Sequence, residues 1–359
     1  MTPLYLDANA TERLRPVARA AVIAALEAGG NPSSVHGDGR AARRRLEEAR
    51  ERVAARFGAR PADTVFTAGG TEANALAIAG LGRGRRVLVG ATEHPAVLAA
   101  AGPAAEVVPV LADGRADLAA LERMLASGPP ALLCLMAANN ETGVLHPIAE
   151  AAALCRAHGA LLHMDAVQAA GRGPLPGGAD SWAISGHKLG GPPGAGALLL
   201  RPGLDLPALI AGGGQERGRR GGTEPLPAIA GLGAAQAAPG EAARLAALRD
   251  RIEAGLAGRA IIAGAGVPRL PNTSCIILPG VAAETQVIAL DLMGVRVSAG
   301  AACSSGKVAR SPVLAAMGLG DLAGCGIRVS LPWDAPEDAP ERFLDAWAAM
   351  RSRLSKNAA

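Results

Sequence analysis

Hydrophobic and polar positions alternate between two patterns from about residue 60 to residue 200. Short apolar runs, typical of strands buried on both faces, occur at residues 65–67, 86–90, 107–110, 131–137, 160–164, 181–184 and 195–200. Segments with helical spacing lie between several of them, at residues 72–80, 118–125 and 148–158. This alternation predicts an α/β fold with a mostly parallel sheet covered by helices on both faces.

The segments on either side of this region have other patterns. Before it, an amphipathic helix at 17–27 and an Arg/Glu-rich helix at 40–57 are separated by a Gly/Pro/Ser loop. After a glycine-rich segment at 212–222, helices are predicted at 241–255, 283–292 and 337–354, with strands at 273–278 and 326–330. This second set predicts a smaller α+β domain.

Composition excludes several classes of protein. Hydrophobic residues make up 50% of the 359 residues and charged residues 19%, so the chain is globular rather than disordered. No uncharged apolar run approaches the ~18 residues of a membrane span. The first residues have no basic segment before an apolar one, which argues against a secretory signal. We therefore expect a cytoplasmic protein without a membrane segment.

The net charge of +4 raises the question of an acidic partner or nucleic acid. The arginines are spread along the chain, however, and aromatic residues are only 2% of it, so no base-stacking surface is evident. We expect no direct binding of nucleic acid. The five cysteines are odd in number and lack C-x-x-C spacing, which argues against a disulfide framework or a structural metal site.

Lysine is rare here, with Lys188, Lys307 and Lys356 the only three. Lys188 lies in Ser-Gly-His-Lys directly after a predicted strand, where ligands of such sheets bind. Arginine cannot replace lysine where an amine must lose its proton and form an imine. Lys188 is therefore a candidate for this chemistry, with a solvated lysine in a turn as the alternative.

Other strand ends carry complementary groups. Asp165 ends a predicted strand, where it could hold the protonated pyridine nitrogen of pyridoxal phosphate or cap the next helix. Gly70 and Thr71 begin a helix, which makes a phosphate site from free backbone N–H groups. His94 could stack on a flat ring or simply begin a helix, and Asn140 could bind a carboxylate or a phenolic oxygen. Together these groups predict a cofactor pocket.

Two residues of the C-terminal part are further candidates. Cys303 lies among small residues between 298 and 312, so packing explains this thiol poorly and it could act as a nucleophile, with an incidental surface cysteine as the alternative. Arg328 could pair with a substrate carboxylate, or be an ordinary strand-edge arginine.

These motifs resemble those of the cysteine desulfurases of the NifS/IscS type, which are pyridoxal-phosphate enzymes of aminotransferase class V with fold type I. The resemblance runs from Tyr5-Leu6-Asp7 to Ile327-Arg328-Val329-Ser330, and its most specific parts are residues 139–143, 185–188, 212–218 and the Cys303 loop. It implies a large domain at 14–238 with a mostly parallel seven-stranded sheet. Residues 1–13 and 239–359 would form the small domain that carries Cys303.

The resemblance also implies the cofactor, the partners and the role of each site residue. The cofactor would be pyridoxal 5'-phosphate, the substrate L-cysteine, the products L-alanine and a persulfide on Cys303, and the protein a homodimer. A protein sulfur acceptor would serve iron–sulfur cluster assembly, thiolated cofactors or tRNA. By the same resemblance, Lys188 would attach the cofactor, Asp165 would contact its pyridine nitrogen, and Gln168 its phenolic oxygen. His94 would stack on the ring and transfer protons, and Asn140 and Arg328 would bind the substrate carboxylate. The phosphate would be bound by Gly70, Thr71, Ser185, His187 and the partner subunit's Thr223.

Three other functions compete with this interpretation. A related lyase of the same fold, such as a selenocysteine lyase, would differ in its relative turnover of cysteine and selenocysteine. A sulfur-relay protein needing a partner for activity would keep the fold with little catalysis. A nicotinamide enzyme is disfavoured because the chain has no G-x-G-x-x-G fingerprint.

Overall fold

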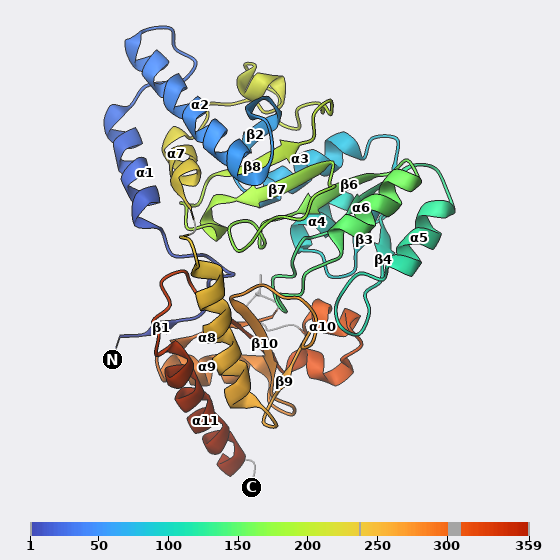
Figure 1. The fold of residues 1–359 in the computed structure, drawn as a ribbon, viewed down its shortest axis with the longest axis vertical. Coiled ribbons are helices and arrows are strands. Elements are labelled where there is room, and N and C mark those ends of the chain that lie inside the picture. Colours follow the sequence, from blue (N-terminus) through green and yellow to red (C-terminus); the bar gives the residue numbers. More distant parts are fainter. Residues whose placement is uncertain (1, 237, 301–309, 358–359) are drawn as a thin grey trace.

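A computed structural model describes residues 2–236, 238–300 and 310–357 of the chain. A seven-stranded and a four-stranded sheet organise these residues, and a further pair of two-residue strands joins segments from the two ends of the chain. The two larger sheets lie in opposite halves of the molecule along its long axis (Figure 1).

The seven-stranded sheet is formed by the predicted apolar runs. Its strands are β2 (Thr64–Thr67), β3 (Arg86–Gly90), β4 (Glu106–Val108), β5 (Ala131–Cys134), β6 (Leu161–Asp165), β7 (Ser181–Ser185) and β8 (Gly196–Leu200), in the order β2-β8-β7-β6-β5-β3-β4. All neighbours are parallel except β8, which is antiparallel to both β2 and β7. The predicted mostly parallel seven-stranded sheet is confirmed.

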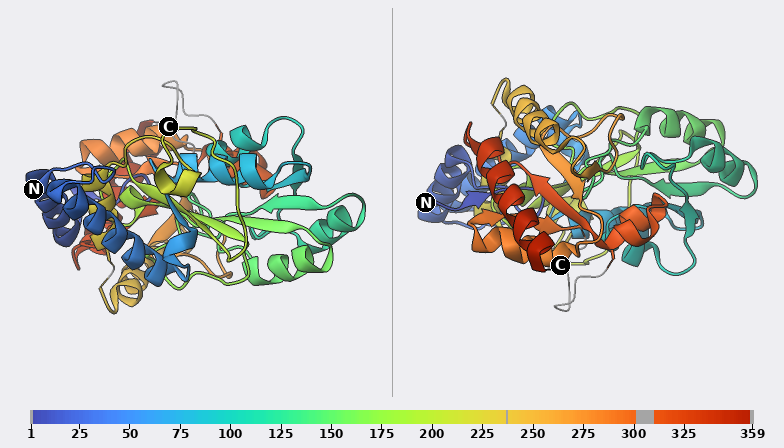
Figure 2. Two further views of the ribbon diagram at one scale, coloured as in Figure 1. Left: turned by 90° about the horizontal axis from the view of Figure 1, so that it is seen from above. Right: turned by 90° about the horizontal axis from the view of Figure 1, so that it is seen from below.

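Successive side chains of the strands pack on opposite faces of this sheet, as the two-residue period requires. Leu133 of β5 belongs to the apolar cluster under α1 (Pro16–Ala28), α2 (Gly37–Phe57), α5 (Leu118–Ala126), α6 (Ile148–Ala157) and α7 (Leu226–Ala234). Leu132 packs instead under α3 (Gly70–Leu81) and α4 (Pro95–Ala101). Figure 2 shows helices on both sides of the sheet. Three short 3₁₀ helices adjoin the strands: η1 (Pro61–Asp63) before β2, η2 (Gly186–Lys188) after β7 and η3 (Gln215–Gly218) after β8.

The four-stranded sheet is antiparallel throughout. Its strands are β9 (Ile261–Ile262), β10 (Thr273–Ile277), β12 (Ser298–Ala299) and β13 (Gly326–Ser330), in the order β12-β13-β10-β9. One apolar cluster holds α8 (Glu241–Leu256), α9 (Ala283–Leu292) and α11 (Ala339–Asn357) against it, and another holds α10 (Pro312–Ala316) and η4 (Gly320–Gly324).

The N-terminal segment packs with this second sheet rather than with the residues that follow it. β1 (Leu4–Tyr5) runs parallel to β11 (Val295–Arg296), and Leu4 and Leu6 are buried in the cluster of α8, α9 and α11. The two-domain division expected from the sequence stays a prediction. In the described ranges, none of the helices has the length and apolar character needed to cross a membrane.

A buried ion pair ties α2 to the glycine-rich segment after β8. Arg50 donates to both carboxylate oxygens of Glu216, at 2.6 and 2.8 Å, and the backbone N–H of Phe66 donates to Glu216 Oε2 at 2.7 Å. Glu216 and Arg217 have left-handed backbone with φ of 48° and 58°, a conformation that costs free energy for residues other than glycine. The ion pair thus holds a strained turn in place.

Candidate active site

The carboxyl ends of the central strands and the edge of the four-stranded sheet enclose a cavity of about 440 Å³. This volume lies within the range of small-molecule sites. Ten residues predicted from the sequence line the cavity, namely Gly70, Thr71, His94, Asn140, Asp165, Gln168, Ser185, His187, Lys188 and Arg328. The parallel topology brings most of them together because successive strands end at the same edge.

One wall of the cavity is suited to a phosphate group. Gly70 and Thr71 form the first turn of α3, whose N–H groups have no intrahelical partners. A Cβ atom on Gly70 would lie 2.6 Å from Val167 Cγ2, so a side chain at position 70 would have to displace Val167. Ser185 at the end of β7 and His187 in η2 add a hydroxyl and an imidazole to the same cavity.

Asp165 is the last residue of β6 and is buried. Its Oδ1 accepts a hydrogen bond from the Val167 N–H at 2.9 Å, and its Oδ2 accepts one from Asn74 Nδ2 at 2.8 Å. Burial raises the pKa of Asp165, while these hydrogen bonds and the nearby His94 and Lys188 act in the opposite direction. A buried carboxylate of this kind favours a cationic partner in the cavity.

His94 is the N-cap of α4, and its Nδ1 accepts a hydrogen bond from the Ala96 N–H at 3.1 Å. Both functions proposed for this residue from sequence are therefore compatible, because the capping histidine also lines the cavity. Burial lowers the pKa of His94, partly offset by Asp165. The ring is thus neutral near pH 7, with its single proton on Nε2.

Lys188 ends η2, and its amine donates to two backbone carbonyls of the N-terminal segment. The distances from Nζ are 2.5 Å to the Asn9 oxygen and 2.8 Å to the Ala10 oxygen. Burial, reinforced by the cations Arg328 and Arg172, lowers the pKa of Lys188 to about 8. About a tenth of the amine is therefore uncharged and nucleophilic at pH 7, far more than for an ordinary lysine.

Arg328 reaches the cavity from β13 of the smaller sheet. Its Nη2 donates to Asp7 Oδ1 at 2.8 Å, and its Nη1 donates to the Asn140 carbonyl at 3.2 Å. Its Nε is buried with no hydrogen-bond partner among the described residues. A buried donor without a partner is costly, so this edge of the guanidinium is available to a carboxylate.

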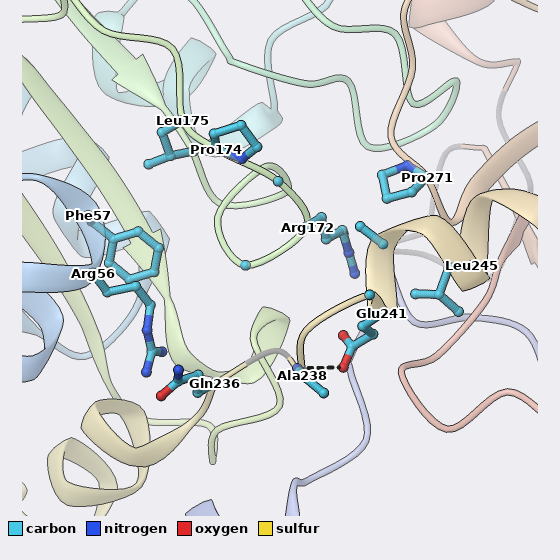
Figure 3. A pocket seen from close by; sticks show the side chains of 14 residues that line it. Arg56, Phe57, Arg172, Pro174, Leu175, Gln236, Ala238, Glu241, Leu245 and Pro271 are labelled. Atoms are coloured by element: carbon cyan, nitrogen blue, oxygen red, sulfur yellow. Dashed lines mark hydrogen bonds between the residues drawn. The ribbon is translucent and has the colours of Figure 1, made fainter.

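Gln168 lines this cavity and is hydrogen-bonded to Arg172, which lines a second cavity. Its Nε2 donates to the Asn9 carbonyl at 3.0 Å, and its Oε1 accepts a hydrogen bond from Arg172 Nη1 at 2.6 Å. Arg172 also lines the second cavity, of about 340 Å³, together with Arg56 and Glu241 (Figure 3). Glu241 is the one carboxylate in the described lining of this second cavity, and it is already paired with Arg15, at 2.6 and 2.8 Å.

Two predicted residues, Thr223 and Cys303, are not among the described residues that line this cavity. Thr223 is exposed and does not line the cavity within this chain, and its proposed contact with the partner subunit's phosphate stays a prediction. Cys303 lies outside the described residues, as does Lys307. The residues that flank them, Gly300 on one side and Pro312 and Val313 on the other, do line the cavity.

Sequence reasoning missed Asn9, Asn74 and Glu93, which also line the cavity. Asn74 lies four residues after Gly70 in α3, so the helical repeat alone would have placed it on the same face. Asn9 acts through its backbone carbonyl, for which the sequence gives no signal.

Comparisons with known proteins give the family. Residues 4–342 match the family described as aminotransferase class-V. A cysteine desulfurase of Cereibacter sphaeroides is 43% identical over 353 aligned residues, covering 92% of this chain and 91% of that protein. The NifS-like protein of Rickettsia africae ESF-5 superposes with a TM-score of 0.91 at 33% identity, covering 98% and 99% of the two chains. SspA, solved in complex with cysteine, has a TM-score of 0.79 at 27% identity, covering 92% and 99%. The chain belongs to the aminotransferase class-V family and, within it, to the cysteine desulfurases.

Proposed function

We propose that the protein uses pyridoxal 5'-phosphate to convert L-cysteine into L-alanine, with the sulfur passing to Cys303. The observation that carries this proposal is the convergence of Lys188, Asp165 and Arg328 on one cavity whose wall also offers an anion site. The relatives named cysteine desulfurase and the neighbour solved with cysteine support the same substrate.

The residues present fit the cofactor at each of its functional groups. The helix start at Gly70 and Thr71, with Ser185 and His187, suits the phosphate. The buried Asp165 suits a protonated pyridine nitrogen, the flat His94 ring suits a stacked aromatic ring, and the Lys188 amine suits covalent attachment. When bound, pyridoxal phosphate supplies an electron sink for negative charge at the substrate Cα.

Substrate recognition falls to Arg328 and Asn140. Arg328 is fixed by Asp7 and keeps the Nε edge for the carboxylate of L-cysteine. Asn140 lines the same region, and its carbonyl accepts a hydrogen bond from Arg328. A guanidinium that binds a carboxylate by two parallel hydrogen bonds orients the amino acid as well as attracting it.

Proton transfer falls to Lys188 and His94. The uncharged Lys188 amine accepts the Cα proton of the substrate, which its lowered pKa favours near neutral pH. Because His94 Nδ1 is occupied by the Ala96 N–H, only Nε2 can exchange a proton with a group in the cavity.

Cys303 is the proposed sulfur acceptor. It lies three residues after Gly300, a distance of at most about 10–11 Å along an extended chain, and Gly300 lines the cavity. The Cys303 thiolate attacks the substrate sulfur, the S–S bond forms, and the Cβ–S bond breaks. The electron pair of that bond stays on the carbon fragment, which takes up protons to become alanine.

We infer further that the protein works as a homodimer, in which the partner's Thr223 reaches the phosphate. The exposure of Thr223 and its absence from the described lining of this chain's own cavity support that arrangement. A protein acceptor then takes the sulfur from Cys303 for iron–sulfur clusters or other sulfur-containing products.

The test is the reaction of L-cysteine with the cofactor-loaded protein in the presence of a reductant. We expect sulfide and alanine in equal amounts, and neither from Cys303→Ser. Alanine and sulfide production by Cys303→Ser would overturn the assignment of the nucleophile. Failure of the wild-type protein to bind pyridoxal phosphate would overturn the proposal as a whole.

A further inference from the structure

A chain of hydrogen bonds leads from Asp165 away from the cavity into the core. Asn74 Nδ2 donates to Asp165 Oδ2 at 2.8 Å, and Asn74 Oδ1 lies 2.9 Å from His163 Nε2. His163 Nδ1 in turn lies 2.8 Å from Ser181 Oγ. Asn74, His163 and Ser181 are all at most 2% exposed, and neither His163 nor Ser181 lines the cavity.

The chemistry of these groups allows one direction of donation when Asp165 is ionised. A carboxylate only accepts, so the Asn74 amide must turn its NH₂ group towards Asp165 and its oxygen towards His163. His163 Nε2 must then carry the proton. Nδ1 is left as an acceptor, which the Ser181 hydroxyl satisfies by donating. Ser181 therefore donates to His163, His163 to Asn74, and Asn74 to the Asp165 carboxylate, which only accepts.

His163 can take this role because it stays neutral. Complete burial lowers its pKa to about 3, so the ring carries one proton throughout the neutral range. If His163 instead carried its proton on Nδ1, its Nε2 would be a bare acceptor. The Asn74 oxygen would then either face that bare nitrogen or, with the amide turned over, face Asp165, which would have to be protonated. The polarity of the chain and the ionisation of Asp165 are thus linked.

We infer that Asn74, His163 and Ser181 form a positioning relay that keeps Asp165 ionised, in the state that would hold the cofactor's protonated pyridine nitrogen. The inference rests on the proposed function, because it assigns the relay to that cofactor. His163 and Ser181 act only through Asn74 and Asp165, and are therefore positioning residues. In the protein interior, where the dielectric constant is low, hydrogen bonds that all donate in one direction polarise one another and become stronger.

Other titratable groups face Asp165 and must be held constant in a test. His94 before α4 and Lys188 in η2 favour its ionised form. Glu93 faces it with an Oε2 that has no hydrogen-bond partner in the described structure, and burial followed by Asp165 raises the pKa of Glu93. Cys134 on β5 lies opposite His163, and burial keeps the pKa of its thiol well above the usual range.

The test measures the dissociation constant of pyridoxal 5'-phosphate for the full-length protein as a function of pH. Loss of the ionised carboxylate weakens binding as the pH falls, so the acid limb of the profile reports Asp165. Removing the His163 donor should raise the pKa of Asp165, since the anion loses support. We expect His163→Leu to move the acid limb upward by about one pH unit, a tenfold change in proton affinity.

Two variants separate the relay from packing. His163→Gln keeps an N–H donor near Asn74 and should restore part of the wild-type profile, and Ser181→Ala should give a smaller upward shift. Cys134→Ala is the matched control because it removes buried bulk beside His163 and leaves every hydrogen-bonding group of the relay in place. Its acid limb should coincide with that of the wild type.

The outcomes are distinguishable. An unchanged acid limb in His163→Leu, or an equal shift in Cys134→Ala, would overturn the relay. If His163→Leu does not fold, His163→Gln and Ser181→Ala decide, and wild-type profiles for both would also overturn it. Absence of cofactor binding by the wild-type protein would count against the proposed function instead.

Discussion

Arg328 Nη2 lies 2.8 Å from Asp7 Oδ1, so the cation that faces the cavity is held by a carboxylate near the other end of the chain. The two side chains are 4% and 21% exposed, which protects the pair from solvent. The Asp7 contact fixes one edge of the guanidinium and leaves Nε for a ligand. The first prediction follows from this geometry.

Arg328→Lys should raise the KM for L-cysteine about tenfold or more. Lysine keeps the charge, but it lacks the planar guanidinium that can contact Asp7 and a substrate carboxylate at the same time. A loss of ~1.4 kcal/mol in binding free energy weakens affinity tenfold. Steady-state kinetics with varied L-cysteine provides the measurement. Arg296→Lys, an exposed position on β11, should leave KM unchanged, and equal effects at both positions would contradict the role of Arg328.

Lys188 should be the lysine that reacts at unusually low pH. In the cofactor-free protein its pKa is lowered to about 8, so half of the amine is free at that pH. With only three lysines in the chain, limited acetylation followed by peptide mass spectrometry gives the midpoint for each. A midpoint near the ordinary value of about 10.4 would show that the Lys188 amine is not perturbed.

Cys303 should be the thiol that an alkylating reagent modifies first. Cys134, Cys155 and Cys275 are buried, and burial raises the pKa of each, to about 12 for Cys155 and Cys275. Reaction with iodoacetamide at pH 7.5 should abolish sulfide release at one equivalent. The partly exposed Cys325 provides the control, because Cys325→Ser should lose neither activity nor its sensitivity to the reagent. Resistance of the activity to alkylation would place the nucleophile elsewhere.

Glu216→Gln should lower the free energy of unfolding by about 3 kcal/mol, the lower end for a broken buried ion pair, because the buried Arg50 charge keeps only the partly exposed Glu47 as a counterion. Denaturant titration measures the loss. The exposed pair Arg251–Glu341 is the comparison, and Arg251→Ala should change stability by about 1 kcal/mol or less. Equal losses for the two variants would show that burial of the Arg50–Glu216 pair has no special weight.

Much of the fold and the site follows from local sequence pattern. The buried runs predicted the seven strands, and Asp165 and Lys188 could be placed at one edge because parallel strands end together. The two-residue strands β1, β9, β11 and β12 were missed because two residues carry no periodicity. Helix α7 was missed because its two glycines and one proline are typical of a loop.

The parts of the site that escaped prediction depend on distant or backbone atoms. The Asn9 carbonyl that binds Lys188 has no side-chain signature, and the Arg328–Asp7 pair joins residues 321 positions apart. The hydrogen bond between His163 and Asn74 joins strand β6 to helix α3. In the sequence alone, His163 is only one position of an apolar strand. Only the folded chain brings these groups within reach of each other.

The pairing of β1 with β11 also sets an order of events during synthesis. The Asn9 side chain donates to Thr273 and its backbone N–H donates to the Ser330 hydroxyl, so the docking of the segment that holds Lys188 stays incomplete until Ser330 has been made. The seven-stranded sheet can assemble on the ribosome before residues 4–10 have their partners in β11 and β13. Closing so long a loop is the slow step expected of distant contacts. The carbonyl groups that bind the reactive lysine are therefore fixed in place only after β13 has been made.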